Sequence, residues 1–253
     1  MFSRKWLPAL LALFCSCSVL EDRMDCPCRL HLDFSDPGNF CNDSLNVHLA
    51  ADNYSRNVSI RAEQYAEGLF VTIPNRKGVY INVSDGLYDN GGEIRIPAGE
   101  QCPETYIFAS YCDTSSDEAE EHVRVRKNYC GVTVSFTSAD PDNYLMSVTG
   151  KICGYSREGI PMEGVFRFSP SFDDRSVSFF RIPRQTDNSL KLGITSSGGT
   201  TRSFALGNYI AESGYDWSKA DLDDIVLTID YAATSIHVTV DDWKKDVPYD
   251  VVI

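Results

Sequence analysis

Hydrophobic and polar residues alternate at every second position along much of the chain. The pattern is clear in residues 30–34, 45–49, 69–73, 79–83, 106–109, 123–125, 132–136 and 177–179. Successive side chains of a β-strand point to opposite faces, so this alternation predicts half-buried strands. Clusters of Gly, Pro, Asn and Asp separate the segments, as at 36–39 and 90–92. The pattern predicts an all-β protein, and a strand spacing of about ten residues favours β-sandwiches over a barrel.

One stretch near the middle breaks the alternation. Residues 113–121 are polar and acidic without periodicity, and they lie between two strand-rich halves. We interpret this run as a solvated linker or long loop that separates an N-terminal domain (17–117) from a C-terminal domain (118–253). The alternative is a metal site on four acids of the run, Asp117, Glu118, Glu120 and Glu121. The run lacks the ligand spacing of a calcium loop, so we expect no metal site.

Composition agrees with two domains. The chain has 253 residues, of which 43% are hydrophobic and 11% aromatic, enough to build two cores. The only helical pattern lies around residues 217–222. Residues 225–231 and 236–240 are expected to form a hairpin across 232–235,.

The last residues of the chain are unusually apolar. Chain ends are normally frayed and polar, whereas residues 247–253 carry apolar side chains at every second position, namely Val247, Tyr249, Val251 and Ile253. Such a terminal strand needs a partner, either in its own sheet or in another subunit.

The first residues have the build of a secretory signal peptide. Arg4 and Lys5 precede a nine-residue apolar run at 6–14,. This run is too short to cross a bilayer as a helix, which takes about 20 residues. We therefore expect export and removal of residues 1–16.

The residues after the apolar run resemble the lipobox at which bacterial lipoproteins are cleaved and acylated. Ser16, a small residue, stands directly before Cys17, whereas Cys15 follows the bulky Phe14. We predict Cys17 as the lipidation site, with Cys15 as the second choice. Two acids follow at 21–22, and they fit either a surface-export signal or a solvated tether. Both readings place the protein outside the cytoplasm.

Charge limits the choice of partners. The net charge is −13, and cleavage removes Arg4 and Lys5 but no acid, so the mature charge is −15. Nucleic acid is not an expected partner, because binding it requires cations that neutralise phosphates. Membrane attachment is expected through acyl chains and not through charge.

Seven cysteines remain after cleavage and acylation. Cys26 and Cys28 are too close for a comfortable mutual disulfide, and no second Cys or His pair completes a zinc site,. If 132–136 and 145–152 formed a hairpin, matched apolar faces would point Cys130 and Cys153 to opposite sides. We predict that these two are not bridged, and the remaining pairings stay open.

Catalytic motifs are missing from the sequence. His31, His48 and His237 alternate with apolar neighbours and are predicted to face solvent, and His122 directly follows the acidic run. No zinc-protease motif, nucleophile elbow or phosphate loop occurs. We expect no enzyme activity and no cofactor.

Several segments together resemble one family. They are residues 17–23 followed by 25–34, residues 180–186 leading into 190–192, and residues 224–231 followed by Asp242 and Trp243. In order and placement these segments resemble the lipid-anchored subunits of Bacteroidales type V fimbriae, the FimB-like or minor-fimbrium anchoring proteins. Residues 41–90 carry no part of the resemblance.

The resemblance implies two tandem transthyretin-like β-sandwiches in a lipoprotein of the outer membrane that faces the cell surface. It also implies fimbrial structural subunits as partners, joined by strand exchange, in which a terminal segment completes the open sheet of a neighbour. The strand-exchange candidates are Val247, Tyr249, Val251 and Ile253. The alternative is a last strand paired within its own sandwich.

Two other function classes stay open. A surface lipoprotein that binds glycans for nutrient uptake would use exposed aromatics, with Tyr215 and Trp217, or Trp243, as a stacking platform. A β-sandwich hydrolase would need two carboxylates that converge from separate strands. The fimbrial role is favoured, and no small-molecule substrate is expected.

Overall fold

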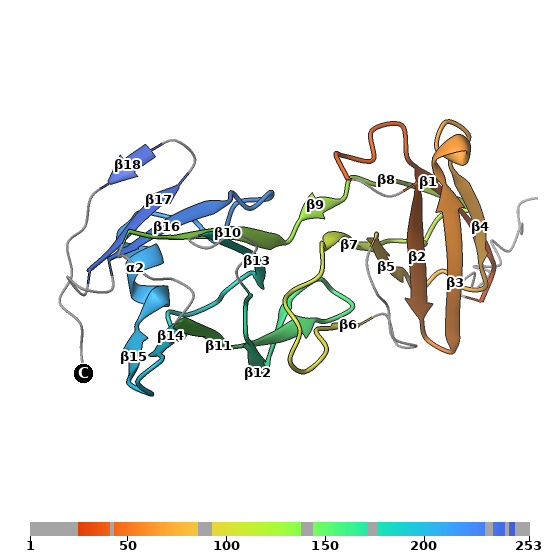
Figure 1. Cartoon of the computed structure of the whole chain (residues 1–253). Coiled ribbons are helices and arrows are strands. Elements are labelled where there is room, and N and C mark those ends of the chain that lie inside the picture. Colours follow the sequence, from red (N-terminus) through yellow and green to blue (C-terminus); the bar gives the residue numbers. More distant parts are fainter. Residues whose placement is uncertain are drawn as a thin grey trace, which may run out of the picture.

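The fold consists of two β-sandwiches that follow each other along the chain (Figure 1). The computed structural model describes residues 25–40, 43–85, 93–137, 144–171 and 177–230, together with the backbone of strands at 235–240 and 243–245. The predicted fold class, all-β with two tandem transthyretin-like β-sandwiches, is confirmed. The predicted signal peptide lies outside the described residues.

The N-terminal sandwich contains two sheets. The smaller has the order β4 (Leu69–Ile73), β1 (Cys28–Asp33), β8 (Glu118–His122). The larger has the order β3 (Tyr54–Arg61), β2 (Ser44–Ala51), β5 (Val79–Ser84), β7 (Tyr106–Cys112), β9 (Arg126–Lys127). A short 3₁₀ turn, η1 (Ala62–Gln64), follows β3.

The C-terminal sandwich also has two sheets. The first has the order β13 (Val177–Pro183), β10 (Tyr129–Phe136), β16 (Ile225–Asp230), β17 (Ser235–Val240), β18 (Trp243–Lys245). The second has the order β12 (Pro161–Phe168), β11 (Tyr144–Tyr155), β14 (Lys191–Ser196), β15 (Thr201–Phe204). A two-residue strand, β6 (Ile94–Arg95), pairs with the end of β11.

Each sandwich buries the apolar positions of its alternating strands. The N-terminal core includes Leu30, Leu32, Val47, Leu49, Val71, Ile73, Ile81 and Val83. The C-terminal core includes Val132, Val134, Val148, Phe180, Leu192, Ile194, Leu227 and Ile229. Burial of a side chain of this size contributes about 1.5–3 kcal/mol. The period-two pattern therefore predicted which face of these strands lies inside. It was wrong for residues 123–125, which form no strand although Val123 and Val125 are buried.

The helical prediction around 217–222 is wrong. Those residues form turns and bends, and the chain's described α-helix is α2 (Leu206–Glu212). Leu206 and Ile210 of this helix are buried in the C-terminal core, and α2 lies at the end of the second sandwich (Figure 1). The predicted C-terminal hairpin is confirmed, because β16 and β17 pair antiparallel from Ile225↔Val240 to Asp230↔Ser235.

The acidic run was expected to be a linker, and this is wrong for its second half. Residues 118–122 form β8, which pairs parallel with β1. Glu118 lies 3.9 Å from Arg29, and Glu120 lies 3.0 Å from His31. Glu118 and Glu120 thus lie on one face of an edge strand, beside Arg29 and His31 on its neighbour.

Strand pairing also bears on the predicted boundary at 117/118. Both β8 and β9 pair with N-terminal strands, whereas β10 begins the C-terminal sandwich. We propose a boundary near Asn128, between β9 and β10. In the opposite direction, residues 94–102 reach the C-terminal sandwich through β6 and through the Cys102 N–H, which donates to the Arg181 carbonyl at 3.1 Å.

Candidate functional site

The residues predicted to carry function lie outside the described residues. These are the lipidation site Cys17 and the strand-exchange candidates Val247, Tyr249, Val251 and Ile253. The described part of the chain ends near them, at β18, which is the last strand in its sheet order. Among the described residues, a group of buried polar contacts lies at the junction of the two sandwiches, around Asn128 and Tyr155.

Tyr155 is at the centre of this junction. Its side chain is fully buried, and its hydroxyl donates to the Asn128 carbonyl and accepts a hydrogen bond from the Arg184 N–H at 2.8 Å. Its ring packs with Ile94 and Ile107, which come from the N-terminal half of the chain. Tyr155 therefore joins residues of both halves through apolar and polar contacts.

Arg184 forms several charge-assisted hydrogen bonds next to Tyr155. Its Nε donates to Oδ1 of Asn128 at 2.8 Å, and its guanidinium also donates to the carbonyls of Trp217 and Lys219. Burial lowers the pKa of Arg184 from its ordinary value. The guanidinium ties the loop before β16 to the start of β10.

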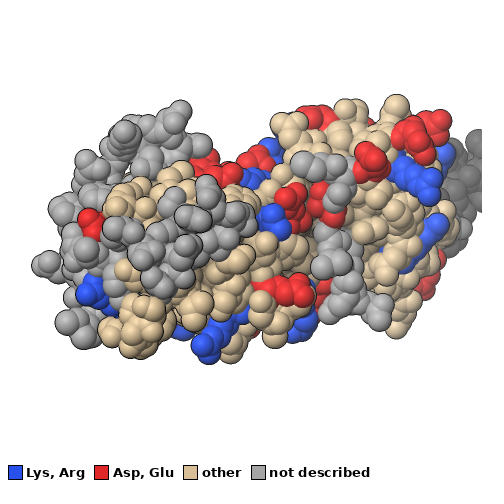
Figure 2. Space-filling view, in the orientation of Figure 1, with Lys and Arg blue, Asp and Glu red and all other residues tan. Residues whose placement is uncertain are grey.

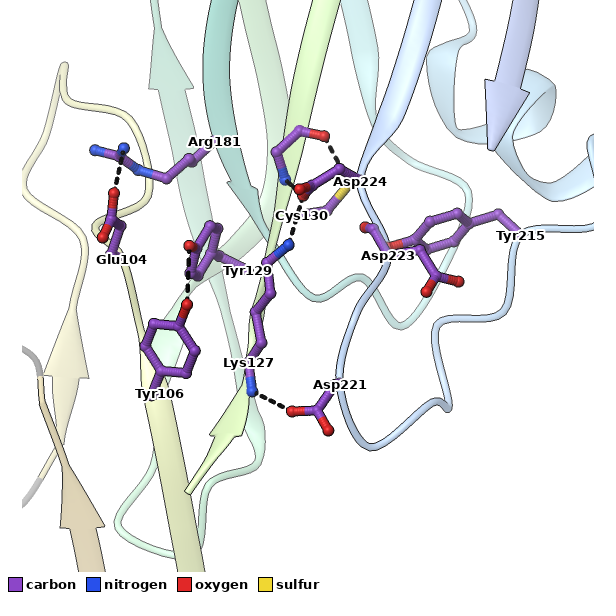
Figure 3. Close-up of polar contacts among 11 residues, drawn as sticks. Glu104, Tyr106, Lys127, Tyr129, Cys130, Arg181, Tyr215, Asp221, Asp223 and Asp224 are labelled. Carbon is purple, nitrogen blue, oxygen red and sulfur yellow. Dashed lines mark hydrogen bonds and ion pairs between the residues drawn. The ribbon is translucent and has the colours of Figure 1, made fainter. Parts of the chain in front are cut away.

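A second group of contacts links β9 to that loop (Figure 3). The Lys127 ammonium lies 2.6 Å from Asp224, and the same carboxylate accepts the backbone N–H of Gly131 at 2.6 Å. Asp221 accepts the backbone N–H of Lys127 and the guanidinium of Arg126, both at 2.9 Å. Two aspartates thus hold the connection between the sandwiches from one side.

The other side of the connection is held by Arg181 and a pair of tyrosines (Figure 3). Arg181 lies 3.2 Å from Glu104 and donates through Nε to the Cys102 carbonyl at 3.0 Å. The hydroxyls of Tyr106 and Tyr129 lie 3.4 Å apart. All of these contacts cross from the N-terminal half of the chain to β10 or β13.

The buried cysteines and tyrosines of the junction stay protonated at neutral pH. Burial raises the pKa of Cys102 and of Cys130 to about 12. Burial also raises the pKa of Tyr129 and of Tyr155 above the ordinary 10.0. A thiol or phenol in this state is neither a nucleophile nor a general base. The arrangement is suited to fixing two sandwiches in one orientation.

The described cysteines are free. They are Cys26, Cys28, Cys102, Cys112, Cys130 and Cys153. Cys130 and Cys153 are not bridged to each other in this structure. The reasoning behind the prediction is corrected, because β10 and β11 belong to different sheets and form no hairpin.

The prediction that the strand histidines face solvent is wrong for His48. His48 is only 4% exposed, and its Nδ1 lies 2.5 Å from Oδ1 of Asn57. Asn82, opposite His48 on β5, is also buried and donates to the Arg157 carbonyl at 2.7 Å. This face of the larger N-terminal sheet contacts the second sandwich at Arg157. His48 and Asn82 are therefore buried although they lie on the face opposite to the core. The side chain of His237 is outside the described residues.

His31 and His122 lie on the outer face of the smaller sheet and pair with carboxylates. The His31 ring is half-buried and stacks on Phe70 with 4.4 Å between centroids. Nδ1 of His122 lies 2.6 Å from Asp33. Within the described residues, no three His, Cys, Asp or Glu side chains are grouped to hold a metal ion.

Tyr215 and Trp217, the stacking platform that the alternative glycan-binding function would use, do not form an exposed platform. Tyr215 is 7% exposed, and its hydroxyl donates to the Asp223 carbonyl at 2.7 Å. Trp217 packs edge-on against Tyr215 with 4.6 Å between centroids. Both rings pack in or against the C-terminal core. The side chain of Trp243 is outside the described residues.

The surface offers no basic patch on the face shown in Figure 2. Over its described part, Lys and Arg side chains are scattered among Asp and Glu. Among the helices that the structure describes, none is long and apolar enough to cross a membrane.

No protein-family model and no curated protein sequence matches this chain. Solved structures do match. A DUF1812 protein from Bacteroides thetaiotaomicron, a candidate polysaccharide-binding protein, has a TM-score of 0.61 at 10% identity and covers 87% of this chain and 98% of its own. A candidate adhesin from Bacteroides ovatus has a TM-score of 0.59 at 12% identity and covers 91% and 97%.

A third match has a described role. The fimbrial anchor protein Mfa2 from Porphyromonas gingivalis has a TM-score of 0.54 at 14% identity and covers 88% of this chain and 100% of its own. Identities this low establish a shared fold and not a shared function. The chain therefore has the tandem β-sandwich fold of this group of adhesin-like and fimbrial proteins.

Proposed function

We propose that this chain is a lipid-anchored anchoring or accessory subunit of a fimbrium, held at the outer membrane and facing the cell surface. The observation that carries the proposal is the fold shared with the fimbrial anchor protein Mfa2 over 88% of this chain and 100% of that one. The predicted export segment and lipidation cysteine support it, since a fimbrial anchor needs a membrane attachment that this chain's charge does not provide.

Attachment is assigned to Cys17. Acyl chains on this cysteine would leave residues 18–24 as a tether before the first described residues. Metabolic labelling with an alkyne analogue of palmitate tests this step. Wild type and a Cys15→Ser control should carry the label and sediment with outer membranes, whereas Cys17→Ser should do neither. A Cys17→Ser protein that keeps both label and membrane association would contradict the assignment.

Partner attachment is assigned to the final residues, 247–253. At about 3.3 Å per residue they reach about 23 Å when extended, the length of an ordinary strand. They follow β18, which ends its sheet in the described strand order. An added strand gains main-chain hydrogen bonds from an open edge, and alternate apolar side chains fill pockets beneath it.

Substitution of the four apolar positions tests this assignment. Serine at Val247, Tyr249, Val251 and Ile253 should abolish recovery of fimbriae with this subunit, while Asp250→Asn should not. Circular dichroism must show that the variant keeps its β-structure. Normal fimbrial assembly by the folded serine variant would contradict the assignment.

The junction gives this role a mechanical basis. A subunit that connects a membrane to a fibre transmits force between its two ends. Contacts of Tyr155 and Arg184 with Asn128, and of Asp224 with Lys127, connect the two sandwiches. We infer that this connection serves load transmission, and that the partners are fimbrial structural subunits.

No catalysis, cofactor or nucleic acid enters this proposal. The pKa values of the buried cysteines and tyrosines at the junction move away from neutrality. The alternative is a nutrient-uptake protein that stacks glycans on Tyr215 and Trp217. These two rings do not support it, because they pack against each other and Tyr215 is buried. The fimbrial role is therefore the better supported of the two.

A further inference from the structure

Two tyrosines lie exposed on the outer face of the larger N-terminal sheet. Tyr80 on β5 and Tyr111 on β7 are direct cross-strand neighbours, with 4.9 Å between ring centroids and an interplanar angle of 59°. They are 44% and 55% exposed. Their strand neighbours Val79, Ile81 and Cys112 point into the core. The pair thus presents aromatic surface to solvent on two adjacent strands of the sheet.

Tyr111 is fixed in place before any ligand arrives. Its hydroxyl donates to the Lys77 carbonyl at 2.8 Å. Its ring lies against Gly78, where φ is +92° and where a Cβ would overlap the Tyr111 hydroxyl. Only glycine fits this combination of backbone conformation and close approach. A rotamer fixed in this way loses little entropy on binding.

The tyrosines border a hollow of about 420 Å³. Its charged lining residues are Asp52, Lys77 and Arg157, and its small lining residues include Ala50 and Gly78. This volume is in the range of small-ligand sites, which are frequent at domain junctions. Asp52 and Lys77 follow β2 and β4, whereas Arg157 comes from the C-terminal sandwich.

Arg157 is brought to the hollow by a specific contact. Its backbone carbonyl accepts a hydrogen bond from the buried amide of Asn82 at 2.7 Å. The turn that carries Arg157 therefore docks on the same sheet as the tyrosines. Both sandwiches therefore contribute to the lining of the hollow, the C-terminal one through Arg157.

We propose that this hollow binds a short acidic carbohydrate. The apolar C–H face of a pyranose ring packs on the electron-rich faces of Tyr80 and Tyr111. A sugar carboxylate is recognised by Arg157 and Lys77, and Asp52 accepts hydrogen bonds from sugar hydroxyls. Two cations against one acid make the lining net positive in a chain whose net charge is −13. The inference goes beyond the fimbrial role and does not depend on it.

The binding test uses the full chain purified in detergent. The probes are an array of oligosaccharides that contain uronic or sialic acids, with neutral counterparts of the same length, followed by calorimetric titration of the best probe. Acidic probes should bind at least about tenfold more tightly than their neutral counterparts. Binding should weaken as salt rises from about 0.05 to about 0.5 M, because the cations are exposed.

Variants connect binding to the hollow. Tyr80→Ser and Tyr111→Ser should each weaken binding by about tenfold or more. Arg157→Gln should remove the preference for acidic probes. Matched controls are Phe179→Ser, an aromatic 48% exposed on the other sandwich, and Arg167→Gln, also exposed. Both controls should bind as wild type does.

Three results would overturn the proposal. One is that no acidic probe binds. Another is that neutral counterparts bind as tightly as acidic ones. The third is that the tyrosine variants, shown by thermal unfolding to be folded, bind as well as wild type. None of these results bears on fimbrial assembly, so the two proposals fail separately.

Discussion

The hydroxyl of Tyr155, at the end of β11, donates a hydrogen bond to the backbone carbonyl of Asn128, between β9 and β10. This contact joins the C-terminal sandwich to the point where the chain leaves the N-terminal one. The backbone N–H of Arg184 donates to the same hydroxyl at 2.8 Å. One buried phenol therefore satisfies two main-chain groups from separate segments.

Tyr155→Phe should destabilise the protein without changing its shape. The substitution leaves the Asn128 carbonyl and the Arg184 N–H without this partner in a buried site, at a cost of about 1–3 kcal/mol. Urea unfolding measures the loss as a lower midpoint. Tyr80→Phe, at a ring 44% exposed, is the control and should change the midpoint little. Equal midpoints for the Tyr155→Phe variant and wild type would contradict the role of this hydroxyl.

Gly154→Ala should detach the segment around β6 from the C-terminal sandwich. A Cβ at Gly154 would overlap the backbone carbonyl of Ile94, which cannot move without breaking the β6–β11 pairing. Hydrogen exchange of residues 94–96 should become faster in this variant. Gly198→Ala, where the added Cβ meets only a distant serine hydroxyl, should leave exchange unchanged. Unchanged protection in Gly154→Ala would count against the pairing.

Stability should fall in acid. The pKa of Asp33 is lowered, first by the backbone N–H of Ser35 and then by His122, and the Ser218 hydroxyl lowers the pKa of Asp216. The folded protein binds these protons less readily than the unfolded chain. The stabilisation is therefore present above the ordinary pKa of 3.8 and is lost as pH falls through the lowered folded values,.

Urea midpoints measured from about pH 6 to about pH 2 test this expectation. The midpoint should drop most steeply below the ordinary carboxyl pKa. Asp33→Asn should lower the midpoint at neutral pH and flatten the acid slope. A midpoint that rises on acidification would refute the sign of the effect.

Native thiols should differ sharply in reactivity. The pKa of Cys102 and of Cys130 is raised to about 12 by burial, and that of Cys112 to about 11, so little thiolate forms near neutral pH,. Cys26 and Cys153 are partly exposed. Iodoacetamide should modify these two first, as read by peptide mass spectrometry, and the buried three only in urea. Labelling of native Cys130 as fast as Cys153 would contradict the buried position.

The period-two pattern predicted strand faces correctly, because burial of one face is a local property of sequence. It did not predict strand partners. The segments that became β10 and β11 follow each other and suggested a hairpin, yet they lie in opposite sheets. Pairing depends on contacts between distant segments, which one sequence does not reveal.

The acidic strand β8 was missed for a related reason. Its residues facing inward include Ala119, which packs only partly against the core, so no apolar alternation marks it. The visible signal was on its partner, where Arg29 and His31 on β1 match Glu118 and Glu120. Similarly, Tyr80 and Tyr111 are ordinary strand tyrosines in the sequence. Their common exposure follows from cross-strand register and from the missing side chain at Gly78.

The role proposed for this chain is that of a fimbrial subunit at the outer membrane. Its most direct test is cross-linking in intact cells, followed by purification of the full-length protein from outer membranes and mass spectrometry of its partners. Fimbrial structural subunits should be recovered with wild type and lost when residues 247–253 are deleted. Recovery of nutrient-transporter components without any fimbrial subunit would contradict it.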